Sequence, residues 1–125
     1  MSETFTNGAF SIEKHVDGNS LSLTFSGKSI LDDPVEFVLP VLTDALTEAD
    51  ESGARLVLDF RNVSYMNSST YAPLVRILHK ARLASSEVSV VYSGAVRWQE
   101  VSFSALNIFQ TRDGRIEITG AADGE

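Results

Sequence analysis

The chain has 125 residues, of which 43% are hydrophobic, the usual size and composition of one globular domain. Its net charge of −7 argues against binding to nucleic acid or to an anionic membrane, because an acidic surface repels phosphate. The absence of cysteine excludes a disulfide scaffold, thiolate catalysis and cysteine-based zinc sites. We therefore expect a single domain over residues 1–125, with flexible ends at 1–8 and 120–125.

The first predicted elements form a β-hairpin. Apolar and polar residues alternate over 10–16, where Lys14 is an exception on the apolar face, and again over 21–25. Alternation with a period of two is typical of a half-buried strand. Asp17-Gly18-Asn19 lies between the two runs and has the residue types of a tight turn. No basic segment followed by an apolar run precedes the hairpin, so we predict no signal peptide.

A helix is predicted over 34–52. Asp33 followed by Pro34 combines a preferred N-cap residue with a proline in the first turn. Apolar residues then recur at helical spacing, and Ser52-Gly53 ends the pattern. Pro40 lies inside it and is expected either to bend the helix or to delay its regular start, because proline removes a backbone donor.

The most informative stretch is 56–83. Its first five residues form an apolar run with one aspartate, Asp59, and predict a strand buried on both faces. Beyond residue 70, apolar residues recur at helical spacing with basic residues between them. The connecting loop brings Asn67, Ser68 and Ser69 to the start of this helix. Their side chains could cap free N–H groups there, and an added phosphate would face the positive end of the helix dipole.

The first residue of this second helix stays open at the level of sequence. Ser68, Ser69 and Thr70 can all act as caps, which is also their purely structural interpretation. Pro73 suits a first helical turn and opposes an earlier start. The position of Asp59 within an apolar strand favours a structural role at the end of that strand.

Three further elements follow. Residues 88–91 predict a buried strand, residues 95–106 a weaker third helix that carries Trp98, and residues 115–119 a short last strand. The predicted order is β-β-α-β-α-β-α-β. It implies an α/β fold with a mixed sheet that is parallel in its centre and covered by helices.

The stretch around the two serines resembles the signature of the STAS domain, the fold of bacterial anti-sigma factor antagonists. That signature is a strand ending in Leu-Asp-Leu, a short turn, and then Phe-Met-Asp-Ser-Ser-Gly at a helix start. The chain has Leu58-Asp59-Phe60 followed by Tyr65-Met66-Asn67-Ser68-Ser69-Thr70. Asn67 replaces the aspartate of the family and Thr70 replaces its glycine. In the order of its elements, the resemblance extends from Ser11 to Phe109.

The resemblance implies a phosphorylation switch. The second serine of the pair is usually the modified residue, which corresponds to Ser69, although some relatives with asparagine at position 67 would use Ser68. The unmodified domain would bind an anti-sigma factor of the serine protein kinase class, which has an ATP-binding fold. That kinase would phosphorylate the serine and end the interaction, and a metal-dependent serine phosphatase would restore it. The expected partner-binding residues are Asn67, Ser68, Ser69, Thr70 and Tyr71.

Such a protein regulates transcription in the bacterial cytoplasm and is not an enzyme. One alternative is a scaffold STAS subunit of a larger signalling assembly, in which the serines are never modified. A small enzyme is the least favoured interpretation, because His15 and His79 stand far apart and no catalytic constellation or phosphate-binding loop is visible. We therefore predict no catalytic residues, no cofactor and no metal site.

Overall fold

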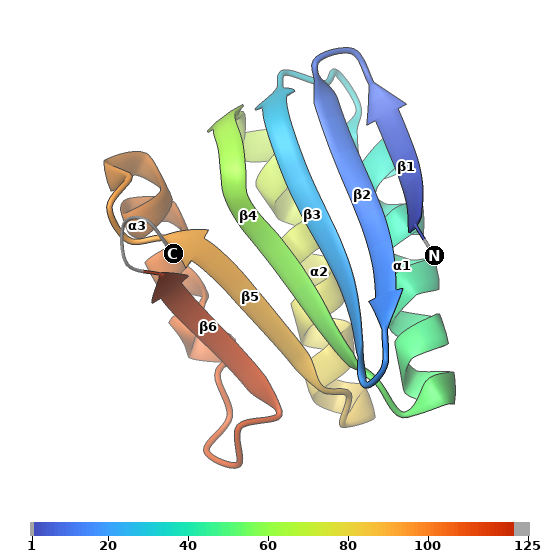
Figure 1. Cartoon of the computed structure of the whole chain (residues 1–125). Coiled ribbons are helices and arrows are strands. Elements are labelled where there is room, and N and C mark those ends of the chain that lie inside the picture. The colour runs from blue at the N-terminus through green and yellow to red at the C-terminus, as the bar shows by residue number, and fades with distance from the viewer. Residues whose placement is uncertain (1, 122–125) are drawn as a thin grey trace.

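The computed structural model describes residues 2–121, which form one six-stranded sheet and three α-helices (Figure 1). The sheet order is β1-β2-β3-β4-β5-β6. The first three strands pair antiparallel, and the pairs from β3 to β6 are parallel. In chain order the elements are β1 (Ser2–Asn7), β2 (Phe10–Asp17), β3 (Ser20–Ser29), α1 (Pro34–Ser52), β4 (Arg55–Met66), α2 (Ser68–Ala84), β5 (Val88–Ser93), α3 (Arg97–Ser104), the 3₁₀ helix η1 (Ala105–Phe109) and β6 (Ile116–Ala121). The predicted mixed α/β sheet is confirmed, with one additional strand at its start.

That additional strand corrects the expectation of a flexible start. β1 pairs antiparallel with β2, from Ser2 opposite His15 to Asn7 opposite Phe10. Most of its side chains are exposed, so they show no burial pattern that sequence reasoning could detect. Backbone hydrogen bonds hold the strand in place instead. At the other end β6 continues through Ala121. The predicted flexibility of residues 1 and 122–125 lies outside the described residues.

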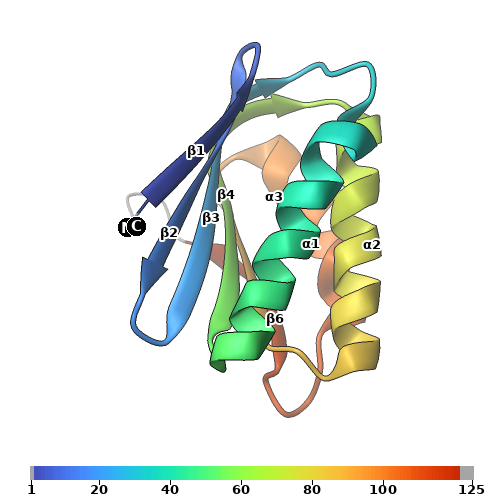
Figure 2. The ribbon, with the colours of Figure 1, turned by 90° about the vertical axis from the view of Figure 1, so that its right-hand side faces the viewer.

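The three helices lie on one face of the sheet (Figure 2). Figure 1 looks onto the opposite face, which no helix covers within residues 2–121. Leu56, Leu58 and Phe60 of β4 are buried on the helical side, whereas Val57 and Asp59 between them are only half-buried. The prediction that this strand is buried on both faces is therefore wrong, because one face has no helical layer.

The hydrophobic core fills the space between the sheet and the helices. Phe25 of β3 stacks on Phe60 of β4 with ring centroids 4.3 Å apart. Lys14, the exception in the first predicted strand, forms an ion pair with Glu48 of α1. This pair lets a charged residue occupy the helical side of β2, since its ammonium group is only partly exposed and has a counter-charge.

Helix α1 starts and ends as predicted. The Asp33 carboxylate accepts a hydrogen bond from the Glu36 N–H at 3.2 Å, and Gly53 ends the helix in the left-handed region at φ 72°. The helix starts at Pro34 and runs through Pro40 without interruption, so of the two effects expected from Pro40 the delayed start is excluded. Proline removes only one donor, and packing of the apolar face compensates. No described helix has the length and apolar character needed to cross a membrane.

Candidate functional site

The start of α2 is built by Asn67, which is its N-cap. The Asn67 side-chain oxygen accepts a hydrogen bond from the Thr70 N–H at 3.0 Å. The cap is therefore none of the three hydroxyl residues, and Ser68 and Ser69 form the first turn. Pro73 lies inside the helix, so the helix begins earlier than the proline suggested. The cost is confined to the Ser69 carbonyl, which has no donor four residues later.

A buried hydrogen-bond network ties this cap to the end of β3. The Thr70 hydroxyl donates to the Asn67 side-chain oxygen and therefore accepts from the hydroxyl of Ser29, which is fully buried. The Asn67 N–H donates to the Ser29 carbonyl at 3.0 Å, and the Asn67 amide donates to the Leu31 carbonyl at 3.3 Å. All polar atoms of the Asn67 side chain are thus engaged. The helix start cannot shift without breaking several of these bonds at once.

The structure divides the predicted contact residues into two groups. Ser68 and Ser69 are exposed, as a modification site requires. Thr70 is only 3% exposed and its hydroxyl is occupied within the network, so it supports the helix start and offers almost no surface. Asn67 and Tyr71 are half-buried and reach the surface beside Ser68. Of the five expected contact residues, Thr70 is therefore the one that the fold buries, and the contact role of the other four stays a prediction.

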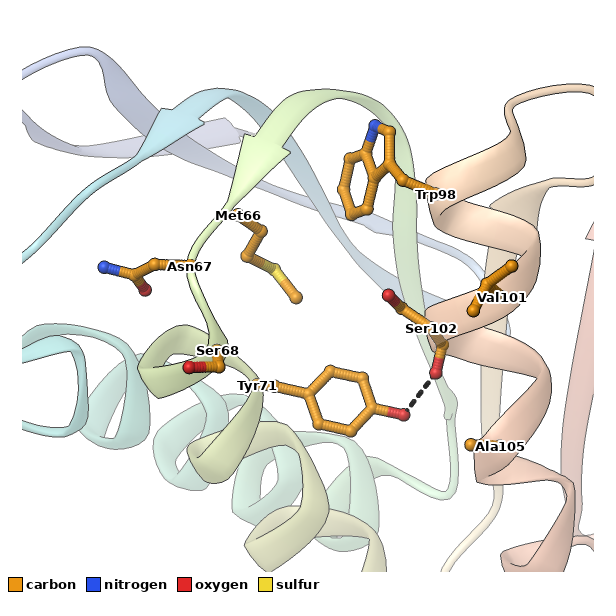
Figure 3. A pocket seen from close by; sticks show the side chains of 8 residues that line it. All are labelled: Met66, Asn67, Ser68, Tyr71, Trp98, Val101, Ser102 and Ala105. Atoms are coloured by element: carbon orange, nitrogen blue, oxygen red, sulfur yellow. Dashed lines mark hydrogen bonds between the residues drawn. The ribbon is translucent and has the colours of Figure 1, made fainter.

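A groove opens between the start of α2 and the helix α3 (Figure 3). Its cavity volume is about 280 Å³. None of its lining side chains is charged, although the whole chain carries −7. We call it the α2–α3 groove; it is lined by Met66, Asn67, Ser68, Tyr71, Trp98, Val101, Ser102 and Ala105. Ser68 lines this groove and Ser69 does not.

Tyr71 joins the two sides of the groove. Its hydroxyl donates a hydrogen bond to the Ser102 carbonyl at 2.6 Å (Figure 3). Burial raises the pKa of the Tyr71 phenol, because the charged phenolate would lose hydration. The phenol therefore stays protonated and keeps this donor at neutral pH.

An aromatic cluster centred on Phe103 of α3 packs this helix against the core. Phe103 is fully buried, with ring centroids 4.9 Å from Phe60, 5.7 Å from Tyr92, 6.1 Å from Tyr71 and 6.2 Å from Trp98. Trp98 thus contacts the core and also lines the groove. Its large amphipathic ring allows one residue to do both.

Asp59, the aspartate of the Leu-Asp-Leu pattern, lies away from this groove. Its side chain alternates with those of Leu58 and Phe60 and so faces the side of the sheet without helices. Burial raises the pKa of its carboxyl, but hydrogen bonds and the charge of Arg61 outweigh this, and the net effect is a lowered pKa. It forms an ion pair with Arg61, in agreement with the predicted structural role, but β4 continues to Met66, so Asp59 lies inside the strand and not at its end. Residues 2–121 contain no group of three acidic, histidine or cysteine side chains arranged to hold a metal.

Sequence reasoning missed Gln99. Its side chain is fully buried, yet its amide bonds to three backbone groups from β4 and β5. A glutamine in a weakly amphipathic helix gives no signal of burial. The only available hint was its place next to Trp98, in the first turn of the short helix that follows β5.

The comparisons with known proteins agree with this architecture. No family model and no curated protein matches the chain. Among solved structures, it is similar to an uncharacterised protein of the DUF3478 family from Shewanella loihica PV-4, described as having a SpoIIAA-like fold. The two share 16% identity over 95% of this chain and 92% of the other, with a TM-score of 0.54. The chain therefore has a SpoIIAA-like fold, the fold of STAS domains, which confirms the fold that the Asn67–Thr70 motif implied.

Proposed function

We propose that this chain is a phosphorylation-switched interaction domain that works as an anti-sigma factor antagonist. Unmodified, it binds an anti-sigma factor of the serine protein kinase class in the bacterial cytoplasm. The kinase modifies Ser69, or alternatively Ser68, and a serine phosphatase reverses this. The observation that carries the proposal is that both hydroxyls are exposed in the first turn of α2, next to the uncharged α2–α3 groove. Domains of this fold are typically not enzymes.

The switch acts on binding more than on folding. A phosphate adds about −1.5 to −2 charges. At the exposed N-terminus of α2 an anion is favoured by roughly 0.3–1 kcal/mol, and the neutral Asn67 repels it less than an aspartate would. A partner packed on the groove must instead desolvate the dianion, which costs several kcal/mol. At about 1.4 kcal/mol per tenfold, affinity falls by about a hundredfold or more.

The test combines identification of the partner with identification of the modified residue. The native protein is used as bait in a lysate, and its own phosphosites are mapped by mass spectrometry. The recovered kinase is then titrated calorimetrically with wild type, Ser69→Ala, Ser68→Ala and Ser69→Asp. We expect Ser69→Ala to bind without being phosphorylated and Ser69→Asp to stay folded but bind weakly. Phosphate found only on Ser68 would move the site by one residue. A large loss of melting temperature on phosphorylation with unchanged affinity would contradict the mechanism.

A scaffold subunit with unmodified serines is the second candidate. The observation that favours it is the complete hydrogen bonding of Asn67 at the position where the family has an aspartate. No free carboxylate remains there for a kinase to recognise. The stoichiometry of phosphorylation in cells separates the two candidates, because a scaffold would show none under any growth condition.

A further inference from the structure

The strands β4 and β5 separate before they end, and this fork is where α3 is attached. Their parallel pairing covers only Leu56 to Asp59 opposite Val88 to Val91. Beyond that point the two ribbons diverge (Figure 1). Both strands nevertheless continue, β4 to Met66 and β5 to Ser93. The facing edges of the two strands therefore lose their mutual hydrogen bonds inside the protein.

The unpaired backbone groups follow from the register. The Leu56 N–H donates to the Glu87 carbonyl at 3.0 Å, so even-numbered residues at this end of β4 turn their polar groups toward β5. Phe60 continues this direction past the last paired residue. The Phe60 carbonyl has no strand partner on that side. A buried carbonyl must therefore accept a hydrogen bond from another donor.

Gln99 of α3 supplies the missing partners. Its side-chain nitrogen donates to the Phe60 and Val63 carbonyls, both at 2.9 Å. Its side-chain oxygen accepts from the Ser93 N–H at 2.7 Å. One fully buried amide thus stands in for the absent strand pairing and bonds to both arms of the fork. No buried side-chain polar atom among the described residues is left without a partner.

The residues around Gln99 in α3 are those that line the groove. Trp98 precedes it, and Val101 and Ser102 follow it by two and three positions. We propose that Gln99 is the positioning residue of the candidate site: its amide holds α3 in the fork and so sets the width of the α2–α3 groove. The consequence for partner binding rests on the proposed function, whereas the geometric role does not.

The experiment uses Trp98, the single tryptophan of the chain, as the reporter of groove width. Emission wavelength and acrylamide quenching are measured on wild type, Gln99→Met and Gln99→Glu, in buffer where each is folded. Gln99→Met removes all three hydrogen bonds. Gln99→Glu keeps the acceptor for Ser93 and removes the donors to β4. Ile12→Ala, a core change in β2, is the control for a general loss of stability.

We expect Trp98 emission to shift to longer wavelength, with faster quenching, in both Gln99 variants and not in Ile12→Ala. The Ser93 amide should exchange with solvent about tenfold faster or more in Gln99→Met, and remain protected in Gln99→Glu. The role of Gln99 is overturned if Trp98 is unchanged in both variants, or if Ile12→Ala changes it equally. Rapid exchange of the Ser93 amide in the wild-type protein would also overturn the role of Gln99. This measurement needs no variant, so it still tests the proposal if the Gln99 variants do not fold.

Binding of the recovered kinase is then measured on the same proteins. A tenfold or greater loss of affinity in the Gln99 variants, absent in Ile12→Ala, extends the positioning role to the partner. If Trp98 responds and no kinase binds even the wild type, the proposed function fails while the role of Gln99 in setting the groove stands.

Discussion

The two sides of the α2–α3 groove are held in place by different means. α2 has 17 residues, an amphipathic pattern and a capped start, and it packs along α1. α3 has eight residues, and its N-cap residue Val96 makes no side-chain capping bond. α3 depends instead on Phe103 and Gln99, which reach across to the sheet. A long helix can be specified by its own sequence, whereas a short one needs tertiary contacts, because short helices are marginal in isolation.

The largest effect should come from removing the core contact of α3. Phe103→Ala deletes a fully buried ring that meets four other aromatic rings. We expect a loss of about 3–5 kcal/mol in the free energy of unfolding, measured by urea denaturation. Val101→Ala on the same helix is the control, since Val101 is 62% exposed and should change stability by less than about 0.5 kcal/mol. Similar losses in both variants would show that α3 is not held by its core side.

The start of α2 should be less sensitive, although its cap has several partners. Asn67→Ala removes the acceptor for the Thr70 N–H and hydroxyl and the donor to the Leu31 carbonyl. We expect a loss of about 2 kcal/mol, the upper end for a lost cap. Ser69→Ala should cost under about 0.5 kcal/mol, because the structure makes Asn67 and not Ser69 the cap. A cost for Ser69→Ala equal to that of Asn67→Ala would contradict this assignment.

The hydrogen bond that joins the two sides of the groove can be removed by deleting one oxygen atom. Tyr71→Phe deletes the hydroxyl that donates to the Ser102 carbonyl and keeps the ring. We expect a loss of about 0.5–1.5 kcal/mol, the net value of one hydrogen bond. Tyr65→Phe removes the same atom from a residue that is 50% exposed and serves as the matched control. Equal unfolding free energies for Tyr71→Phe and wild type would mean that the two sides are not coupled through this bond.

The smallest effect concerns the face of the sheet that has no helices, and it depends on pH. The ion pair with Arg61 gives Asp59 a lowered pKa in the folded protein. A lowered pKa stabilises the folded state at pH values above the unfolded-state pKa of about 3.9. This contribution disappears as the pH falls through the pKa of the folded state. Wild type should therefore exceed Asp59→Asn in stability near neutral pH by a few tenths to about 1 kcal/mol. The difference should shrink as the pH falls below the unfolded-state pKa and through the lower pKa of the folded state, as followed by thermal melting across the pH range. A constant difference would exclude the ion pair as its cause.

Much of the fold follows from local patterns in the sequence. The alternation in β2 and β3, the Asp33-Pro34 start of α1 and the helical spacing in α2 each depend on neighbouring residues, and each of these elements was predicted. The bounds agree closely except for β3, which continues to Ser29 beyond the predicted residue 25. The exposed serines at the start of α2 were predicted for the same reason. The choice of N-cap stayed open because Asn67, Ser68, Ser69 and Thr70 have similar capping chemistry, and the choice depends on buried bonds to Ser29 and Leu31.

Only the tertiary structure decided the remaining features. β1 is held by backbone bonds to β2, which leave no mark on its exposed side chains. Which face of the sheet is covered depends on the path of the connections and not on the residues of any one strand. The groove needs the end of β4, the start of α2 and α3 together. It forms where Gln99 bonds to Phe60 and Val63 of β4 and to Ser93 of β5, which is 30 or more residues away from them in the chain. A buried polar residue is recognised as such only when its partners are in place, since its sequence alone predicts a solvated side chain.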